Sequence, residues 1–177
     1  MPDVEVVPYD GSWPARAEAA IAEIRAALAG VPLEIEHIGS TAVPGLAAKP
    51  IIDLMAAAPA LDDIAARAGD LAGIGFTAQD NGIPGRLFFV RDDGGRRSHH
   101  LHVVTADGWP TRNQRLLRDH LREHPADVRR YAGLKRRLAG GGLSADDYTR
   151  AKTELIQELT DRARTARGLP PVPVWES

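Results

Sequence analysis

Over the first 110 residues, the pattern of hydrophobic and polar positions predicts strands with interleaved helices. Strands are expected where apolar residues alternate with polar ones or run without a break, and helices where they recur every three or four positions. The expected strands are 4–7, 33–38, 50–57, 75–78, 87–91 and 99–105, and the expected helices are 14–30 and 61–71. The unbroken apolar run 50–57 is typical of a strand that is buried on both faces.

Beyond Thr111 the pattern predicts helices alone. Leucines recur at helical spacing from Leu116, a second run follows Val128, and a third follows Ser144, which forms a capping-box pattern with Asp147. Strands with interleaved helices, followed by helices only, predict an α+β fold with a mixed sheet. We expect three segments, namely an α/β core over 1–110, a helical segment packed on it over 111–167 and an extended tail over 168–177.

Composition narrows the class of protein. A chain of 177 residues is long enough to bury a sizeable core, and the absence of cysteine excludes disulfides, thiolate metal sites and thiol nucleophiles. A formal net charge of −2 argues against a dedicated nucleic-acid binder. We find no apolar stretch long enough to cross a membrane and no basic region typical of a signal peptide. The sequence therefore predicts a cytoplasmic protein.

Charge is distributed unevenly along the chain. Residues 1–60 contain three basic and eight acidic residues, a net charge of −5, whereas residues 112–137 contain nine basic and three acidic residues, a net charge of +6. Two interpretations remain open. The opposite charges could form a cleft for a ligand that carries phosphate, or the arginines could lie on a solvated helix face.

Two candidate sites lie near the first long strands. The turn Gly39-Ser40-Thr41 offers hydroxyls and successive backbone N–H groups, which suit an anion, although an ordinary turn is the alternative. Asp53 is the one carboxylate inside the apolar run 50–57. A buried carboxylate is costly unless it is paired or bound to a metal. This favours a functional role over an aspartate that backbone donors satisfy.

Histidines and lysines provide further candidates. In a strand, His100 and His102 share one face and His99 lies on the other, so the same-face pair suits a metal or acid–base chemistry. Partly exposed histidines without a function are the alternative. On the later helices, Tyr131 with Lys135 and Tyr148 with Lys152 repeat a spacing of four residues. These lysines could meet a phosphate or lie over apolar surface.

The segment Glu36–Asp53, with the sequence EHIGSTAVPGLAAKPIID, resembles the GrpB-like family. So do Val7-Pro8-Tyr9-Asp10 with Trp13, the stretch His100–Val104 and the two tyrosine–lysine pairs. This family looks like part of the nucleotidyltransferase superfamily, and a similar domain is fused to some dephospho-coenzyme A kinases. The resemblance implies a nucleotidyltransferase-like mixed sheet flanked by helices, with a C-terminal helical segment.

The resemblance also implies roles for individual residues. In the superfamily, a Gly-Ser turn holds nucleotide phosphates and an Asp-x-Asp pair holds divalent metal. Gly39 and Ser40 match the turn, and Asp53 matches the first metal carboxylate. Met55 stands in the place of the second carboxylate, and a later strand offers histidines where a third acid is expected. One aspartate with imidazoles favours zinc, iron, nickel or copper over magnesium.

Two functions are compatible with these residues. The first is a nucleotidyltransferase-like enzyme acting on a nucleotide or other phosphorylated small molecule, with a divalent metal and a nucleotide such as ATP as expected cofactors. The predicted catalytic residues are Asp53, His100 and His102, with Asp53 and His102 as metal ligands. The predicted phosphate- or nucleotide-binding residues are Gly39, Ser40, Thr41, Lys49, Tyr131, Lys135, Tyr148 and Lys152. The second function is a non-catalytic ligand-binding or accessory module with a degenerate site.

Overall fold

The computed structural model describes residues 5–141 and 144–174, and its contacts divide the chain into two compact units. We call residues 10–42 and 51–109 the sheet unit. Residues 5–9, 43–50 and 110–174 form the helical unit, so that two short N-terminal segments belong with the later helices.

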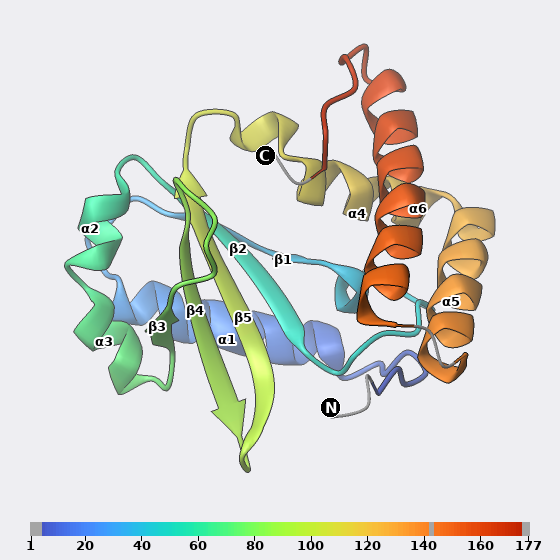
Figure 1. Ribbon diagram of the computed structural model, residues 1–177. Helices are drawn as coiled ribbons and strands as arrows, with labels where there is room; N and C mark the ends of the chain where they lie inside the picture. The colour runs from blue at the N-terminus through green and yellow to red at the C-terminus, as the bar shows by residue number, and fades with distance from the viewer. Residues whose placement is uncertain (1–4, 142–143, 175–177) are drawn as a thin grey trace. The chain divides into compact units, whose positions relative to one another are not determined.

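The sheet unit is built around a mixed sheet. Its elements are α1 (Trp13–Ala27), β1 (Glu34–Ile38), the 3₁₀ turn η1 (Ser40–Ala42), β2 (Ile52–Ala58), α2 (Leu61–Ala65), α3 (Ala68–Gly73), β3 (Thr77–Gln79), β4 (Leu87–Asp93) and β5 (Arg96–Thr105). In the described chain, the strands form one five-stranded sheet in the order β1-β2-β5-β4-β3 (Figure 1). β2 pairs with β5 in parallel and the other pairs are antiparallel. The predicted α+β fold with a mixed sheet is confirmed.

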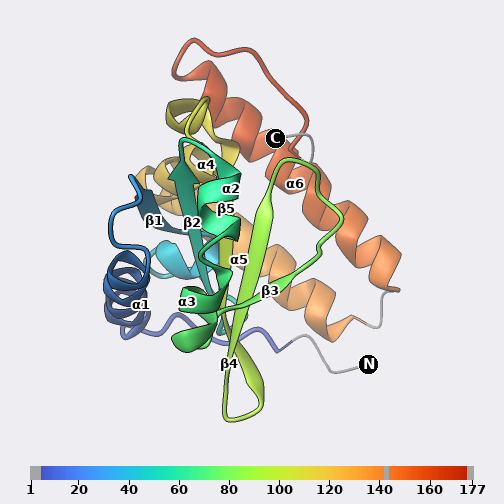
Figure 2. The ribbon, with the colours of Figure 1, turned by 90° about the vertical axis from the view of Figure 1, so that its left-hand side faces the viewer.

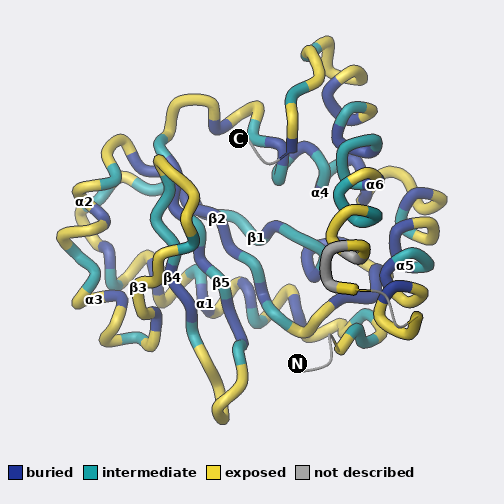
Figure 3. The backbone as a smooth tube through the Cα atoms, viewed as in Figure 1, coloured by how far each residue is buried: buried dark blue, intermediate teal, exposed yellow. Residues whose placement is uncertain are grey.

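The two faces of this sheet have different roles. β2 is buried over almost its whole length, as its apolar run predicts (Figure 3). α1 packs against β1 and β2 on one face (Figure 2). Arg91 of β4 pairs with His99 of β5, and the Arg91 side chain reaches Glu23 of α1, with 2.7 Å between Nη1 and Oε2. Arg91 and His99 therefore lie on the α1 face, and the neighbouring residue His100 lies on the opposite face.

The helix expected over 61–71 is instead two short helices, α2 and α3, which are separated near Arg67. The backbone of Arg67 leaves the helical region, with φ −105° and ψ 14°. Its guanidinium donates to the carbonyl oxygens of Ala27, the last residue of α1, at 2.7 Å and of Ala29, just beyond that helix, at 3.2 Å. Carbonyls at a helix end lack intrahelical donors. The tertiary contact therefore outweighs continuation of the helix.

The β4–β5 hairpin is longer than the apolar pattern predicts. β4 continues to Asp93 and β5 begins at Arg96, three residues before His99. Gly94 and Gly95 connect the strands with φ values of +58° and +78°. Two consecutive residues with positive φ match the tight turn whose twist suits a two-residue hairpin. The turn therefore allows the polar ends of both strands to pair.

The helical unit contains the 3₁₀ turn residues Pro110 and Thr111 and the helices α4 (Asn113–Glu123), α5 (Pro125–Gly140) and α6 (Ala145–Thr165). The three helices contact one another. Their buried core consists of Val43, Leu46, Ala47, Leu121, Tyr131, Ala132, Leu155 and Leu159. The predicted cap at Ser144 is confirmed, because Oγ of Ser144 accepts from the backbone N–H of Asp147 at 3.1 Å.

Two chain ends of the helical unit complete the fold. The strand expected over 4–7 is, among the described residues, a single bridge between Val7 and Ala48. After α6 the chain is extended and bound to that helix. The Gln157 side chain donates to the Val172 carbonyl and accepts from the Val174 N–H, both at 3.0 Å. Among residues 5–141 and 144–174, no helix is long and apolar enough to cross a membrane.

Candidate functional site

The turn after β1 brings the backbone against a carboxylate. Gly39 has a φ of +75°, and a Cβ atom added to it would lie 2.8 Å from Oδ2 of Asp53. Only glycine fits both the backbone conformation and this close approach. The turn is closed by the Ala42 N–H, which donates to the Gly39 carbonyl at 3.1 Å. The predicted turn residue Gly39 and the predicted catalytic residue Asp53 therefore lie together.

Ser40 and Thr41 differ in their surroundings. Ser40 is half-buried at the start of η1. Thr41 is buried, with an exposed fraction of 1%, and its Oγ1 lies 2.8 Å from Nε2 of His37 on β1. That bond ties the turn to the preceding strand. It gives Thr41 a structural contact, whereas its predicted role in phosphate binding stays a prediction.

Asp53 and His100 form a pair at the centre of the sheet. They are directly opposite each other on β2 and β5. Nδ1 of His100 lies 3.1 Å from Oδ1 of Asp53, and both side chains are partly exposed, by 26% and 31%. Because Nδ1 donates to the carboxylate, Nε2 of a neutral His100 is left as a proton acceptor.

His102 completes the group, two residues along β5. Asp53, His100 and His102 each offer a ligand atom within 4.8 Å of the others. Nδ1 of His102 is buried and has no hydrogen-bond partner. Burial lowers the pKa of His102 to about 4, against an opposing effect of Asp53. The imidazole is therefore neutral at pH 7, which is the form that binds metals.

This donor set fits a divalent cation. Each of the three side chains can offer a lone pair, and the buried Nδ1 of His102 lacks the partner that a buried nitrogen normally has. One carboxylate with two imidazoles matches zinc, iron and similar metals. Among the described residues, this is the one group of three or more such side chains close enough to hold a metal ion.

Phe88 on β4 is a neighbour of the site that the sequence analysis missed. Its ring centroid lies 5.2 Å from that of His100 and 4.9 Å from that of His102. Phe88 is directly opposite His102 in the β4–β5 pairing. Alternation in the strand 87–91 marks its face, but only the register shows which histidine it meets. Such packing restricts the orientations of both imidazoles.

Met55 is buried with 0% exposure and belongs to an apolar cluster with Ile38, Ala57, Val104 and Trp109. This cluster lies on the site's face, next to the Asp53 row of the sheet. The place of the expected second carboxylate is therefore filled by apolar packing.

The remaining predicted binding residues belong to the helical unit. Lys49 is exposed, and Lys152 is half-buried. Lys135 is buried, with Nζ 4.4 Å from the Tyr131 ring centroid, a cation–π contact. The Tyr148 side chain lies outside the described residues. The part of all five in ligand binding stays a prediction.

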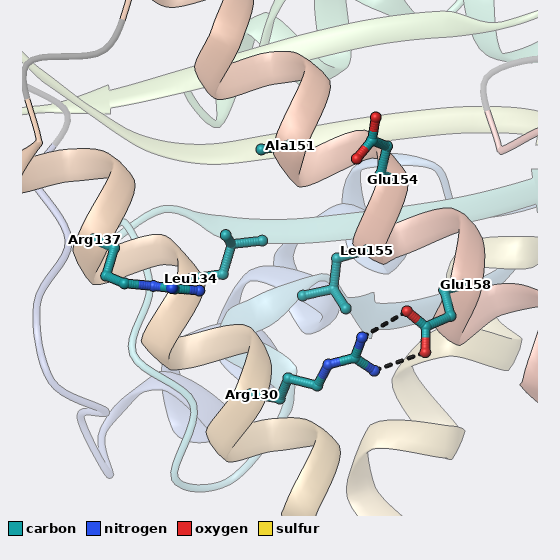
Figure 4. Close-up of a pocket in the computed structure, with 7 residues that line it drawn as sticks. All are labelled: Arg130, Leu134, Arg137, Ala151, Glu154, Leu155 and Glu158. Atoms are coloured by element: carbon teal, nitrogen blue, oxygen red, sulfur yellow. Dashed lines mark hydrogen bonds and ion pairs between the residues drawn. The ribbon is translucent and has the colours of Figure 1, made fainter.

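Some of the positive charge of the helical unit is paired within that unit. Arg130 donates to both carboxylate oxygens of Glu158, at 2.7 and 2.6 Å, across the groove between α5 and α6 (Figure 4). These hydrogen bonds lower the pKa of Glu158. Arg162 lies 3.3 Å from Asp127. For these arginines the contacts support the interpretation of a solvated, ion-paired helix face.

Known proteins of similar sequence include relatives that match most of this chain and a kinase that matches a part of it. The sequence profile of the family described as GrpB protein matches residues 3–162. A UPF0157 protein of Pseudomonas aeruginosa is 41% identical over 175 residues, covering 94% of this chain and 70% of its own length. A dephospho-CoA kinase of Mycolicibacterium paratuberculosis is 41% identical over 54 residues, which are 29% of this chain and 13% of the kinase. The expected relation to a kinase-fused domain is thus confirmed for a part of the chain.

Solved structures agree with the fold. The crystal structure of GrpB from Enterococcus faecalis has a TM-score of 0.82 and 28% identity, covering 93% of this chain and 99% of its own. The Cid1 poly(U) polymerase in its MgGTP-bound form has a TM-score of 0.54 and 17% identity, covering 76% of this chain and 44% of its own. The second likeness shows a nucleotidyltransferase-like fold alone. By sequence profile and by identity to its relatives, the chain belongs to the GrpB family.

Proposed function

We propose that this protein is a nucleotidyltransferase-like enzyme that acts on a nucleotide or another phosphorylated small molecule. The observation that carries the proposal is the convergence of Asp53, His100 and His102 on one face of the sheet. The fold supports it, because the Cid1 polymerase with a similar fold binds a magnesium nucleotide. The location of Gly39 against Asp53 supports it as well, since a turn whose backbone could bind phosphate lies next to the carboxylate that could bind a metal.

Asp53 and His102 are the proposed metal ligands. When bound, a divalent cation would supply Lewis-acid stabilisation of charge on the phosphate oxygens. Asp53 contributes negative charge, and His102 contributes a neutral nitrogen because burial keeps its pKa low. The backbone of Gly39 and Ser40 is proposed to bind the phosphates.

His100 is the proposed general base. Asp53 accepts from Nδ1 and so orients the ring, leaving Nε2 to take a proton. In nucleotidyl transfer, an acceptor hydroxyl oxygen forms a bond to the α-phosphorus of the nucleotide. Pyrophosphate leaves with the electron pair of the broken P–O bond, and the hydroxyl proton passes to Nε2 of His100. Charge and atoms balance without a further reactant.

A second candidate function is a ligand-binding or accessory module without catalysis. The specific observation in its favour is Met55, which is fully buried in an apolar cluster where the superfamily places its second carboxylate. Two-metal transfer in the superfamily depends on oxygen ligands for magnesium. Loss of one of them is compatible with a site that still binds a ligand but does not turn it over.

Calorimetric titration of ATP, first with Mg²⁺ and then with Zn²⁺, tests the proposal. We expect saturable binding that weakens in Asp53→Asn and Ser40→Ala. Asp62→Asn is a matched control, since Asp62 is exposed on α2 of the same unit. Mass spectrometry of ATP incubated with alcohol-bearing metabolites then identifies the product. Absence of saturable heat with both metals would contradict nucleotide transfer. Binding without any product would favour the module.

A further inference from the structure

A second carboxylate, that of Glu36, lies in the row of the sheet next to Asp53. The strand register defines two neighbouring rows across β1, β2 and β5. One row consists of Ile38, Asp53 and His100, and the next consists of Glu36, Met55 and His102. Glu36 is thus directly opposite Met55, the residue that stands where a second metal carboxylate was expected.

The side chain of Glu36 belongs to the same face as the metal-binding candidates. Ile38 and Met55 share one apolar cluster, so both lie on that face. Residues two apart in a strand point to the same side, which places Glu36 with Ile38. Glu36 is half-buried, whereas Glu34, two residues earlier on the same face, is exposed. Glu36 is therefore more covered than Glu34, although both stand on the edge strand β1.

The backbone of Glu36 also lies near that of Asp53, and in this structure the Glu36 carboxylate is not among the ligand atoms within 4.8 Å of one another at Asp53, His100 and His102. The two residues are diagonal neighbours on the antiparallel strands β1 and β2. Diagonal neighbours are roughly 7–8 Å apart, which long side chains can span. Glutamate carries its carboxylate one methylene further from the backbone than aspartate. A rotation of the Glu36 side chain, past the buried Met55 side chain, would bring its carboxylate toward that of Asp53.

We propose that Glu36, on β1, is a further metal-binding carboxylate of this site. It takes the place of the second carboxylate of the superfamily, where this chain has Met55. The inference rests on the proposed metal site at Asp53 and His102. Two carboxylates at close range repel each other when both are ionised, and a divalent cation removes the repulsion. With Glu36 the donor set contains two carboxylates beside the imidazoles. Such a set suits oxygen-preferring Mn²⁺ as well as nitrogen-preferring Zn²⁺.

Metal titrations of the whole chain test the inference. Free Mn²⁺ is measured by electron paramagnetic resonance, and Zn²⁺ by competition with a chromophoric chelator. Glu36→Gln should weaken Mn²⁺ binding at least about tenfold and Zn²⁺ binding by a smaller factor, because the lost ligand is oxygen. Glu34→Gln, on the same strand and face but exposed, should leave both affinities at the wild-type value.

The outcomes separate this inference from the proposed function. If the wild type binds neither metal, the metal site itself is wrong. If Asp53→Asn abolishes binding while Glu36→Gln keeps wild-type Mn²⁺ affinity, the role of Glu36 alone is overturned. Circular dichroism and metal-free melting check that Glu36→Gln is folded. If Glu36→Gln is not folded, Glu36→Asp is measured in its place, because aspartate keeps the negative charge on a shorter side chain. Wild-type Mn²⁺ affinity in Glu36→Asp would overturn the inference.

Discussion

Gly39 and Asp53 are in such close contact that no side chain fits between them. A Cβ atom on Gly39 would lie 2.8 Å from Oδ2 and 3.1 Å from Cβ of Asp53. The other carboxylate oxygen, Oδ1, is 3.1 Å from Nδ1 of His100. The turn after β1 and the imidazole on β5 therefore flank the Asp53 carboxylate and restrict its orientation.

Replacement of Gly39 by alanine should weaken metal binding at least about tenfold, because the carboxylate must move. The positive φ should also cost about 1–2 kcal/mol of stability. Gly30→Ala is the matched control. Gly30 has a φ of +91° but nothing within 4 Å of an added Cβ, so it reports backbone strain alone. Chemical unfolding and Mn²⁺ titration measure the two effects. Equal metal affinity in the two variants would argue against the carboxylate contact.

Replacement of His102 by alanine should remove a stoichiometric metal. The reason is that its neutral imidazole is one of three donors within 4.8 Å of one another. Metal content of the purified protein, measured by inductively coupled plasma mass spectrometry, checks this. His124→Ala is the control, since His124 is exposed on the helical unit. Retention of metal by His102→Ala would exclude His102 as a ligand.

The metal-free protein should lose stability as the pH falls from about 6.5 to about 4. His99 lies in a closed network on the α1 face. Arg91 donates from Nε to Nδ1 of His99 at 3.4 Å, and its Nη2 lies 3.1 Å from Nε2 of the same ring. Oγ of Ser98 lies 2.8 Å from Nδ1 and donates to the Arg91 carbonyl at 3.0 Å. Burial and then the Arg91 charge lower the pKa of His99 to about 4. Protonation would leave the ring no nitrogen that can accept from Arg91.

The folded state loses stability at low pH because the pKa of His99 is lower in the folded than in the unfolded chain. The unfolded chain therefore binds more protons between about pH 6.5 and 4, and stability falls as the pH falls. His102 contributes in the same direction, because burial lowers its pKa to about 4 as well. Urea unfolding at pH 7.5, 6 and 5 with a chelator measures the loss. His99→Gln should show a shallower decline than the wild type. Identical pH profiles would contradict the network.

Replacement of Arg67 by alanine should destabilise the protein by about 1–3 kcal/mol, because two carbonyls at the C-terminal end of α1 lose their donors. The bonds concerned run to Ala27 and Ala29. Arg150→Ala is the control, since the Arg150 side chain is 72% exposed and its ion pair with Asp147 measures 4.0 Å. Denaturant unfolding compares the two. A loss in Arg67→Ala no larger than in Arg150→Ala would show that the contact contributes little.

Short-range patterns in the sequence predicted much of the fold. The alternation in the strand around His100 and His102 correctly placed both on one face and His99 on the other. The apolar run with Asp53 correctly predicted a buried strand. The segment Glu36–Asp53 identified the family, which the profile match confirmed. These features depend only on residues close in the chain, where periodicity reports directly on burial.

The tertiary structure decided which of these residues meet. The contact of Asp53 with His100 joins residues 47 positions apart and depends on the parallel pairing of β2 with β5. The pairing of β1 with β2 sets Glu36 opposite Met55, and the fold of the turn sets Gly39 against Asp53. The split at Arg67 likewise depends on carbonyls some 40 residues away. Strand register is set by packing across the whole sheet, so local periodicity assigns a face but not a partner.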